Sequence, residues 1–144
     1  MLTKLLTPKI GIELEFYLTQ YQEQILNEKT IDDFIENLSL EIDQHKIQLL
    51  KIEKEQGQGQ IEIKTLPYTN IKKLSSDLKS IKNISQNLAK KSGFGANFEP
   101  SPFLDDCSSA LQINLSILNQ KQQNIFNIPK DQSFIVFMTL DEPF

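Results

Sequence analysis

Four glutamates lie in two short segments of otherwise apolar, strand-like sequence: Glu13, Glu15, Glu55 and Glu62. Glu13 and Glu15 are two positions apart, and residues with this spacing on a strand project from one face with about 7 Å between their Cα atoms. Carboxylates at this distance repel each other unless a cation lies beside them. Carboxylate oxygens suit Mg²⁺ or Mn²⁺, ions that bridge nucleotide phosphates. The pattern predicts a divalent metal beside a phosphate, and the alternative is a solvent-facing strand edge.

A glycine-rich turn separates Glu55 from Glu62, and residues 55–62 read Glu-Gln-Gly-Gln-Gly-Gln-Ile-Glu. Gly57 and Gly59 allow the backbone to turn sharply and to approach a ligand closely. The segment lacks the Gly-Lys-Ser/Thr ending of a phosphate-binding P-loop. The glutamates, rather than a P-loop, are therefore the candidate groups here.

A third polar set comprises Gln112, Asn114 and Ser116, which alternate with apolar residues and share one face of a predicted strand. Amide and hydroxyl groups can bind a metal or a phosphate but lack acid–base power. The alternative is that they lie on the solvent-exposed face of a sheet and bind nothing. We assign no catalytic residue. His45, the only histidine, is expected at a helix end, and the acidic residues before Cys107 disfavour its thiolate.

The pattern of apolar residues predicts the strands that must position these groups. Alternation or extended sequence predicts strands at five places: residues 10–18, 46–55, 61–65, 94–98 and 110–118. With the helices described next, these strands predict one α+β domain over residues 1–144, with a mainly antiparallel sheet flanked by helices.

Helical spacing predicts three helices. The first covers residues 31–44, with Thr30 as N-cap and Asp32 and Asp33 in its first turn. The second follows a cap at Thr69 or Asn70 and ends near Gly93. Its expected buried stripe is Ile71, Leu74, Leu78, Ile81, Ile84 and Leu88. A last apolar helix is expected over residues 134–140.

Composition excludes several classes of protein. The net charge is −4, and all 15 basic residues are lysines, which disfavours nucleic-acid binding. No apolar run approaches the roughly 20 residues that a membrane helix needs, and the amino terminus does not resemble a signal peptide. Cys107 is the only cysteine, so an intramolecular disulfide is impossible. We therefore expect a cytoplasmic protein without membrane or nucleic-acid partners.

Three segments together resemble the catalytic domain of glutamine synthetase. Residues 11–18 resemble the first metal strand of that family, Gly-x-Glu-x-Glu-Phe-Phe/Tyr-Leu, and residues 55–62 resemble its Glu-x-x-x-Gly-Gln-x-Glu segment. Residues 98–103 and 105–116 resemble its Phe-Met-Pro-Lys-Pro and Gly-Ser-Gly-Met-His-x-His-x-Ser segments. The resemblance extends over residues 10–140 and keeps the order and spacing of all three motifs.

The resemblance implies ligands and roles. Two divalent ions, Mg²⁺ or Mn²⁺, would be held by Glu13, Glu15, Glu55, Glu62 and Gln112, the last standing where the family has a metal-binding histidine. Ser116 and Asn114 would lie near ATP. The family phosphorylates the γ-carboxylate of glutamate with ATP and then lets ammonia displace the phosphate. The implied function is an ATP-dependent glutamate–ammonia ligase.

The sequence also departs from the family pattern. The Asn-Gly pair that binds glutamate falls on Cys107 and Ser108, and the second histidine falls on Asn114. We expect the amino-terminal small domain and the carboxy-terminal half of the family to lie outside this sequence, which also contains no arginine to clamp a transferring phosphoryl group. We therefore expect a partial catalytic domain that is not self-sufficient, is completed by a second chain and is compatible with homo-oligomers.

Alternatives remain at this point. Glutamate–cysteine ligases share the Gly-x-Glu-x-Glu start and commonly carry a Gln-x-Asn or Gln-x-Thr strand where the synthetase has histidines, and Gln112 and Asn114 resemble the first version. The seven-residue step from Glu55 to Glu62 resembles the synthetase instead. The same departures are compatible with an inactive binding or regulatory module, or with a gene remnant.

Overall fold

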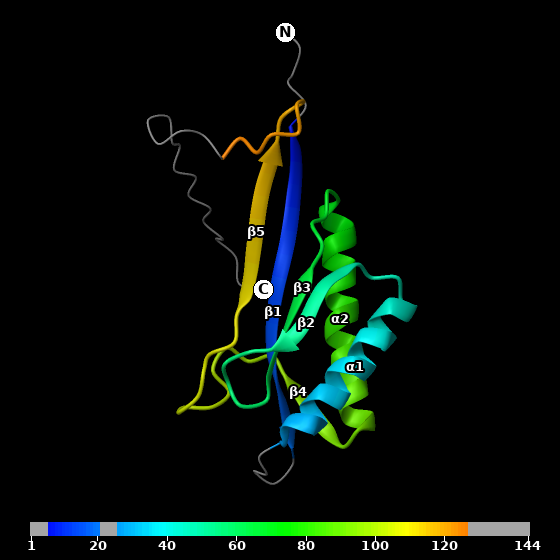
Figure 1. Cartoon of the computed structure of the whole chain (residues 1–144), viewed down its shortest axis with the longest axis vertical. Coiled ribbons are helices and arrows are strands. Elements are labelled where there is room, and N and C mark those ends of the chain that lie inside the picture. Colours follow the sequence, from blue (N-terminus) through cyan, green and yellow to red (C-terminus); the bar gives the residue numbers. More distant parts are fainter. Residues whose placement is uncertain (1–5, 21–25, 127–144) are drawn as a thin grey trace.

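The computed structural model describes residues 6–20 and 26–126. Its elements follow the chain as β1 (Thr7–Gln20), α1 (Glu28–Gln44), β2 (Leu49–Lys54), β3 (Gln60–Thr65), α2 (Ile71–Lys91), β4 (Phe94–Asn97) and β5 (Leu111–Leu118). Within these residues the strands form one antiparallel sheet with both helices on one face, as Figure 1 shows. The predicted α+β class is therefore confirmed, whereas the helix predicted over residues 134–140 lies outside the described residues.

The long strand β1 is the centre of the sheet. It pairs with β3 along one edge, through residues 13–17, and with β5 and then β4 along the other edge. Strand β2 lies beyond β3. The β1–β5 pair runs past the helices as a two-stranded ribbon (Figure 1). Because β1 has partners on both edges, the glutamates that it carries lie in the middle of the sheet.

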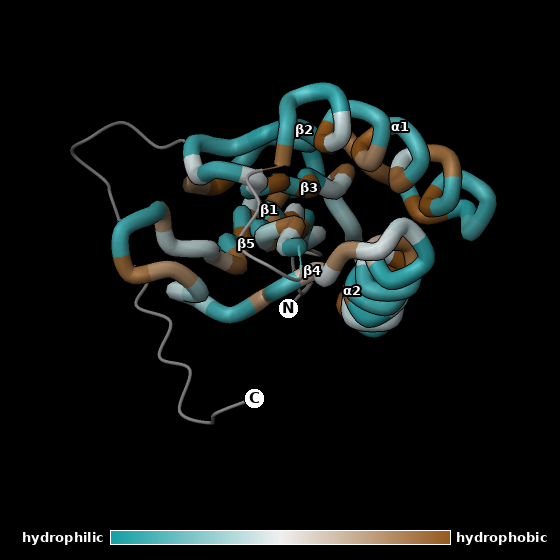
Figure 2. Tube along the Cα trace, turned by 90° about the horizontal axis from the view of Figure 1, so that it is seen from below, coloured by the Kyte–Doolittle hydropathy of each residue, from teal (hydrophilic) through white to brown (hydrophobic). Residues whose placement is uncertain are grey.

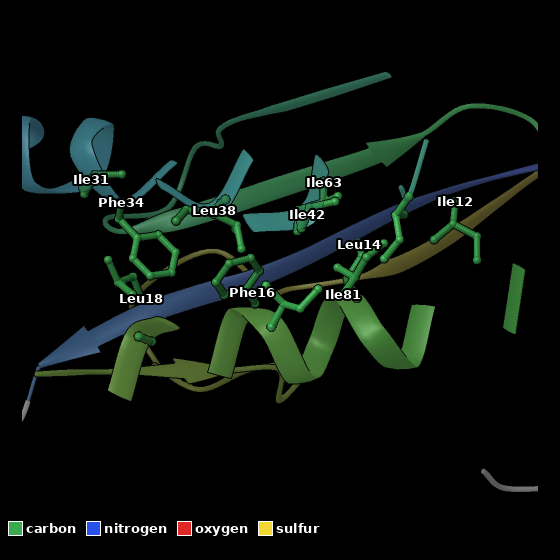
Figure 3. Packing of buried hydrophobic residues seen from close by; sticks show 14 of the residues in the cluster. Ile12, Leu14, Phe16, Leu18, Ile31, Phe34, Leu38, Ile42, Ile63 and Ile81 are labelled. Carbon is green, nitrogen blue, oxygen red and sulfur yellow. The ribbon is translucent and has the colours of Figure 1, made fainter. Parts of the chain in front are cut away.

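The helices cover the apolar face of the sheet. Alternate residues of β1 and β3 point into this layer, and the helices turn their hydrophobic sides toward it (Figure 2). Figure 3 shows the packing, and the buried residues include Ile12, Leu14, Phe16, Leu18, Ile61 and Ile63 from the strands, with Ile31, Phe34, Leu38, Ile42, Leu74, Ile81 and Ile84 from the helices. Period-two alternation then directs the glutamates to the opposite face.

The start of α1 differs from the prediction. Asn27, not Thr30, is the N-cap, and its side-chain oxygen accepts a hydrogen bond from the Thr30 N–H at 2.8 Å. The acidic residue of the first turn is consequently Glu28. Asparagine caps helices at least as well as threonine. The first helical turn is polar, so it contributed no apolar periodicity from which the earlier start could be predicted.

The ends of α2 agree with the prediction, but one buried residue does not. Asn70 is the N-cap and accepts hydrogen bonds from Lys72 N–H and Lys73 N–H, and Gly93 has a φ of 81° just after the C-cap. Ile71, predicted to be buried, is 65% exposed. The buried stripe begins one turn later, at Leu74.

Replacing Asn70 with alanine should lower the free energy of unfolding by about 1 kcal/mol, because two N–H groups lose their acceptor. Urea denaturation followed by circular dichroism measures the change. Asn83→Ala is the matched control, since Asn83 is exposed within the same helix and alanine is the better helix former. Equal stability of the two variants would contradict the capping role.

Candidate functional site

The face of the sheet opposite the helices carries four carboxylates and a lysine. The antiparallel register places Glu15 opposite Glu62, and Glu13 opposite Lys64, across β1 and β3. The register of β2 with β3 places Glu53 on the other side of Glu62. We call these five residues the acidic row. The structure therefore brings together three of the four predicted glutamate ligands and adds Glu53 and Lys64.

Glu15 is held in a fixed position within the acidic row. Its Oε2 accepts hydrogen bonds from the Ala110 N–H at 3.0 Å and from Gln60 Nε2 at 3.1 Å. Its backbone N–H donates to the Ala110 carbonyl. These two donors fix the orientation of the buried carboxylate.

Glu62 is compensated in a different way. Its side chain is only 4% exposed, and Lys64 Nζ lies 2.8 Å from its Oε2 and 3.4 Å from Glu53 Oε1. Among the residues that the structure describes, no donor is aligned for a directed hydrogen bond to that buried oxygen, so the contact is an ion pair. Burial raises the pKa of Glu62, Lys64 opposes this rise, and Glu13 adds to it. The Glu62 carboxylate in turn holds the pKa of Lys64 above its usual value.

The predicted polar strand lies beside Glu13. Asn114 Nδ2 donates to Glu13 Oε1 at 2.9 Å, and Gln112 is the residue opposite Glu13 in the register of β5 with β1. Asn114, Ser116, Glu13 and Lys64 line an open cavity of about 290 Å³. The structure thus places the two residues expected near the nucleotide around one cavity with part of the acidic row.

Glu55 stands two positions after Glu53 of the acidic row. It follows the last residue of β2, and its backbone N–H donates to the Gln60 carbonyl. Among the described residues, no hydrogen bond or ion pair involves its carboxylate. Over residues 6–20 and 26–126, no three His, Cys, Asp or Glu side chains are grouped so that they could hold a metal as they stand. The set of metal ligands therefore remains a prediction.

The glycine turn packs against Tyr17 of β1. The Tyr17 side chain is fully buried, and its hydroxyl donates to the Cys107 carbonyl at 2.8 Å. A Cβ on Gly57 would lie 1.9 Å from the Tyr17 hydroxyl oxygen, so glycine is required there by close packing. Gly59 is required by its φ of 83°. The group that approaches Gly57 is thus a side chain of the protein itself.

Asp106 joins the loop before β5 to the same turn. It accepts hydrogen bonds from the Cys107 N–H at 2.7 Å and the Gln58 N–H at 3.0 Å. These two donors, that of Cys107 first, hold the pKa of Asp106 below its usual value. Burial, followed by the Asp106 charge, raises the pKa of Tyr17 to about 12. The turn and the loop therefore form one connected unit beside Glu15.

Three residues of this region were not predicted from the sequence: Lys64, Glu53 and Gln60. Gln60 and Lys64 flank Glu62 at two positions' distance, and Glu53 stands two positions before Glu55. Their positions two residues from a predicted glutamate indicate the same strand face, and this spacing was the signal that could have identified them. Their partners lie on neighbouring strands, which the spacing within one segment does not identify.

A larger cavity lies away from this region, in the helix layer. It has a volume of about 470 Å³ and is lined by residues of the last turns of α1 and α2, including Glu41 and Lys91. His45 also lines it and is the C-cap of α1, which confirms its predicted place at a helix end. Its Nδ1 lies 2.9 Å from the Glu41 carbonyl oxygen. In the part of the chain that the structure describes, neither helix is long and apolar enough to cross a membrane.

Comparison with known proteins identifies the family. The family described as "Glutamine synthetase, catalytic domain" matches residues 20–137, and the chain belongs to it. Glu13 and Glu15 precede the matched range, whereas the other predicted site residues lie within it. No curated protein matches the chain significantly.

Solved structures show the same fold. One is described as a novel glutamine synthase homolog, with a TM-score of 0.73 and 18% identity over 89% of this chain and 32% of that chain. Two others are GmaS in complex with ADP and GmaS without ligand, each with a TM-score of 0.70 and 18% identity over 88% of this chain and 33% of that chain. The chain spans about a third of the length of these structures.

Proposed function

We propose that the chain is the metal- and nucleotide-binding part of a glutamine synthetase-like, ATP-dependent carboxylate–amine ligase. The observation that carries the proposal is the register of Glu13, Glu15 and Glu62 on one sheet face. Asn114 and Ser116 line a cavity with Glu13 on the same side. The family match supports the class of reaction. The working location would be the cytoplasm, and residues 1–144 would form a single partial catalytic domain.

The residues present fit a divalent cation in chemistry and in register. Carboxylate and amide oxygens are the ligands that Mg²⁺ and Mn²⁺ prefer. Glu62 Oε2 is a buried oxygen with no aligned hydrogen-bond donor in the described part of the chain, which suits a metal ligand. In this proposal Glu13, Glu15 and Glu62 hold the ion, and Gln112 and Glu55 complete the set. The side chains must rearrange for this, because Lys64 now contacts Glu62.

In this proposal the metal ion, the residues that orient its ligands and a second chain have separate roles. A bound Mg²⁺ or Mn²⁺ would neutralise charge on the phosphates of ATP during formation of γ-glutamyl phosphate. Gln60 and the Ala110 N–H orient Glu15, and Asn114 orients Glu13. The described residues contain no arginine that could clamp a transferring phosphoryl group. We propose that a second chain supplies this clamp and the rest of the glutamate and ammonia sites.

A second candidate function is nucleotide or metabolite binding without turnover. The ion pair between Lys64 and Glu62 favours it, because the buried carboxylate is already compensated without a metal. Glutamate-dependent release of ADP that is abolished by Glu62→Gln would exclude this candidate. A glutamate–cysteine ligase-like reaction would instead require cysteine as the amine.

Calorimetric titration of a non-hydrolysable ATP analogue into the purified chain tests the proposal. We expect binding that depends on Mg²⁺ and that weakens at least about tenfold in Glu62→Gln, since even residues that merely support a metal ligand change affinity by this amount. Glu36→Gln, an exposed glutamate of α1, is the matched control. Absence of Mg²⁺-dependent binding to the unaltered chain would overturn the proposal.

A further inference from the structure

We propose that the Lys64 ammonium is a built-in cation of the acidic row, which takes the position of a divalent ion beside Glu62 and competes with it. The inference rests on the proposed function, because it concerns the same carboxylates. Its new element is that Lys64 sets the affinity of these carboxylates for a metal ion. Lys64 lies on β3 two positions after Glu62 and opposite Glu13, so its side chain belongs to the same face of the sheet.

The contacts of the acidic row single out Lys64. Its Nζ lies 2.8 Å from Glu62 Oε2 and 3.4 Å from Glu53 Oε1, so one ammonium contacts carboxylates on both β2 and β3. Glu15 is instead compensated by hydrogen-bond donors, and Glu13 by Asn114. Within the described ranges, Lys64 is the cation in contact with Glu62. Glu53 also contacts Lys51, so among the described carboxylates of the row Glu62 is the one that relies on Lys64 alone for a cation.

Burial makes this compensation necessary. The Glu62 side chain is almost completely buried, and a buried carboxylate without an opposite charge is strongly unfavourable. Lys64 supplies the opposite charge in the absence of any ion. Carboxylates that lie this close together repel one another when no positive charge compensates them. With Lys64 in place, the acidic row is therefore stable without a metal.

The same contact brings Lys64 into competition with a divalent ion. A divalent ion bound to Glu62 Oε2 would lie next to the Lys64 ammonium, which is 2.8 Å from the same oxygen, and two neighbouring cations repel. Lys64 is partly exposed and also lines the open cavity, so its flexible side chain has room to move away. Displacement of Lys64 is therefore part of metal binding at this site, and it lowers the metal affinity.

The test compares Mn²⁺ binding by calorimetry to the unaltered chain and to Lys64→Met. We expect Lys64→Met to bind Mn²⁺ at least about tenfold more tightly, because one repelling charge is removed. Lys64→Arg, which keeps the charge, should retain the original affinity. Lys51→Met is the matched control, since Lys51 contacts Glu53 from the same region but does not contact Glu62. Equal affinity of Lys64→Met and the unaltered chain would overturn the inference.

Thermal melting gives a second readout. Without metal, Lys64→Met should melt at a lower temperature than the unaltered chain, and Mn²⁺ should restore it by binding the folded state. If Lys64→Met is insoluble both with and without Mn²⁺, chemical labelling of lysines in the unaltered chain tests whether a metal displaces Lys64. Mg²⁺ should then increase the reaction of Lys64 with an amine-specific reagent and leave Lys51 unchanged. An unchanged rate at Lys64 would contradict the inference.

The outcomes separate this inference from the proposed function. Metal binding to Lys64→Met but not to the unaltered chain would support the role of Lys64 and contradict the proposed function. Metal-dependent nucleotide binding to the unaltered chain, without tighter metal binding by Lys64→Met, would support the proposed function and contradict the role of Lys64.

Discussion

Replacement of Phe16 with alanine is expected to lower the free energy of unfolding by about 3–5 kcal/mol, the range for truncating a buried aromatic side chain. Phe16 lies in the middle of β1, is 0% exposed and packs between the sheet and the helices. Its ring also stacks on that of Phe98, with centroids 4.8 Å apart. Alanine would leave a cavity in the centre of the core and remove this aromatic contact.

Urea denaturation followed by circular dichroism measures the loss, and the melting temperature should fall by roughly 10 °C or more. Leu104→Ala is the control, because Leu104 is also a large apolar residue but is 100% exposed. Its stability should stay within about 0.5 kcal/mol of the unaltered chain. A loss in Phe16→Ala no larger than that in Leu104→Ala would show that the core is not packed as described.

Replacement of Gly57 with alanine is expected to cost about 2–3 kcal/mol, through overpacking and the loss of a buried hydrogen bond. The new Cβ would lie 1.9 Å from the Tyr17 hydroxyl and 2.7 Å from Gln60 Oε1. The Tyr17 ring is buried, and its hydroxyl donates a hydrogen bond to the Cys107 carbonyl. The ring therefore cannot move without losing this hydrogen bond. Gln60 also orients Glu15, so the change extends to the acidic row.

Gly11→Ala is the matched control on the same sheet. A Cβ at Gly11 would meet its nearest neighbours, the Thr65 carbonyl oxygen and Asn114 Cβ, at 3.8 and 3.9 Å, which is ordinary contact. Stability should be unchanged or slightly higher, since alanine restricts the unfolded chain. Unfolding curves of the two variants check the difference, and hydrogen exchange of residues 105–110 should accelerate only in Gly57→Ala. Curves that coincide would rule out the contact between the turn and Tyr17.

The sequence predicted most of the elements because their signals are local. Alternation along residues 10–18 identified β1, and the spacing of Phe34, Leu38 and Ile42 identified α1. Asn70 and Gly93 correctly marked the ends of α2. Where the local signal was weak the prediction was wrong, as at Asn27, whose helix begins with a polar turn.

The features that were not predicted depend on contacts between distant segments. The pairing of Glu62 with Glu15 and of Lys64 with Glu13 follows from strand register, which one segment does not encode. The contact of Tyr17 with the Cys107 carbonyl joins residues 90 positions apart. The glutamates were found as chemical groups, but their compensation by Gln60, Asn114 and Lys64 required the structure.

The most direct test of the proposed cation site is a Mn²⁺ titration followed by electron paramagnetic resonance, with the unaltered chain and Glu62→Gln measured side by side. The account predicts that the unaltered chain binds Mn²⁺ and releases it to excess Mg²⁺. It also predicts that Glu62→Gln loses this binding while Glu36→Gln retains it. Mn²⁺ that stays free in the presence of the unaltered chain, or that binds equally to all three proteins, would contradict the account.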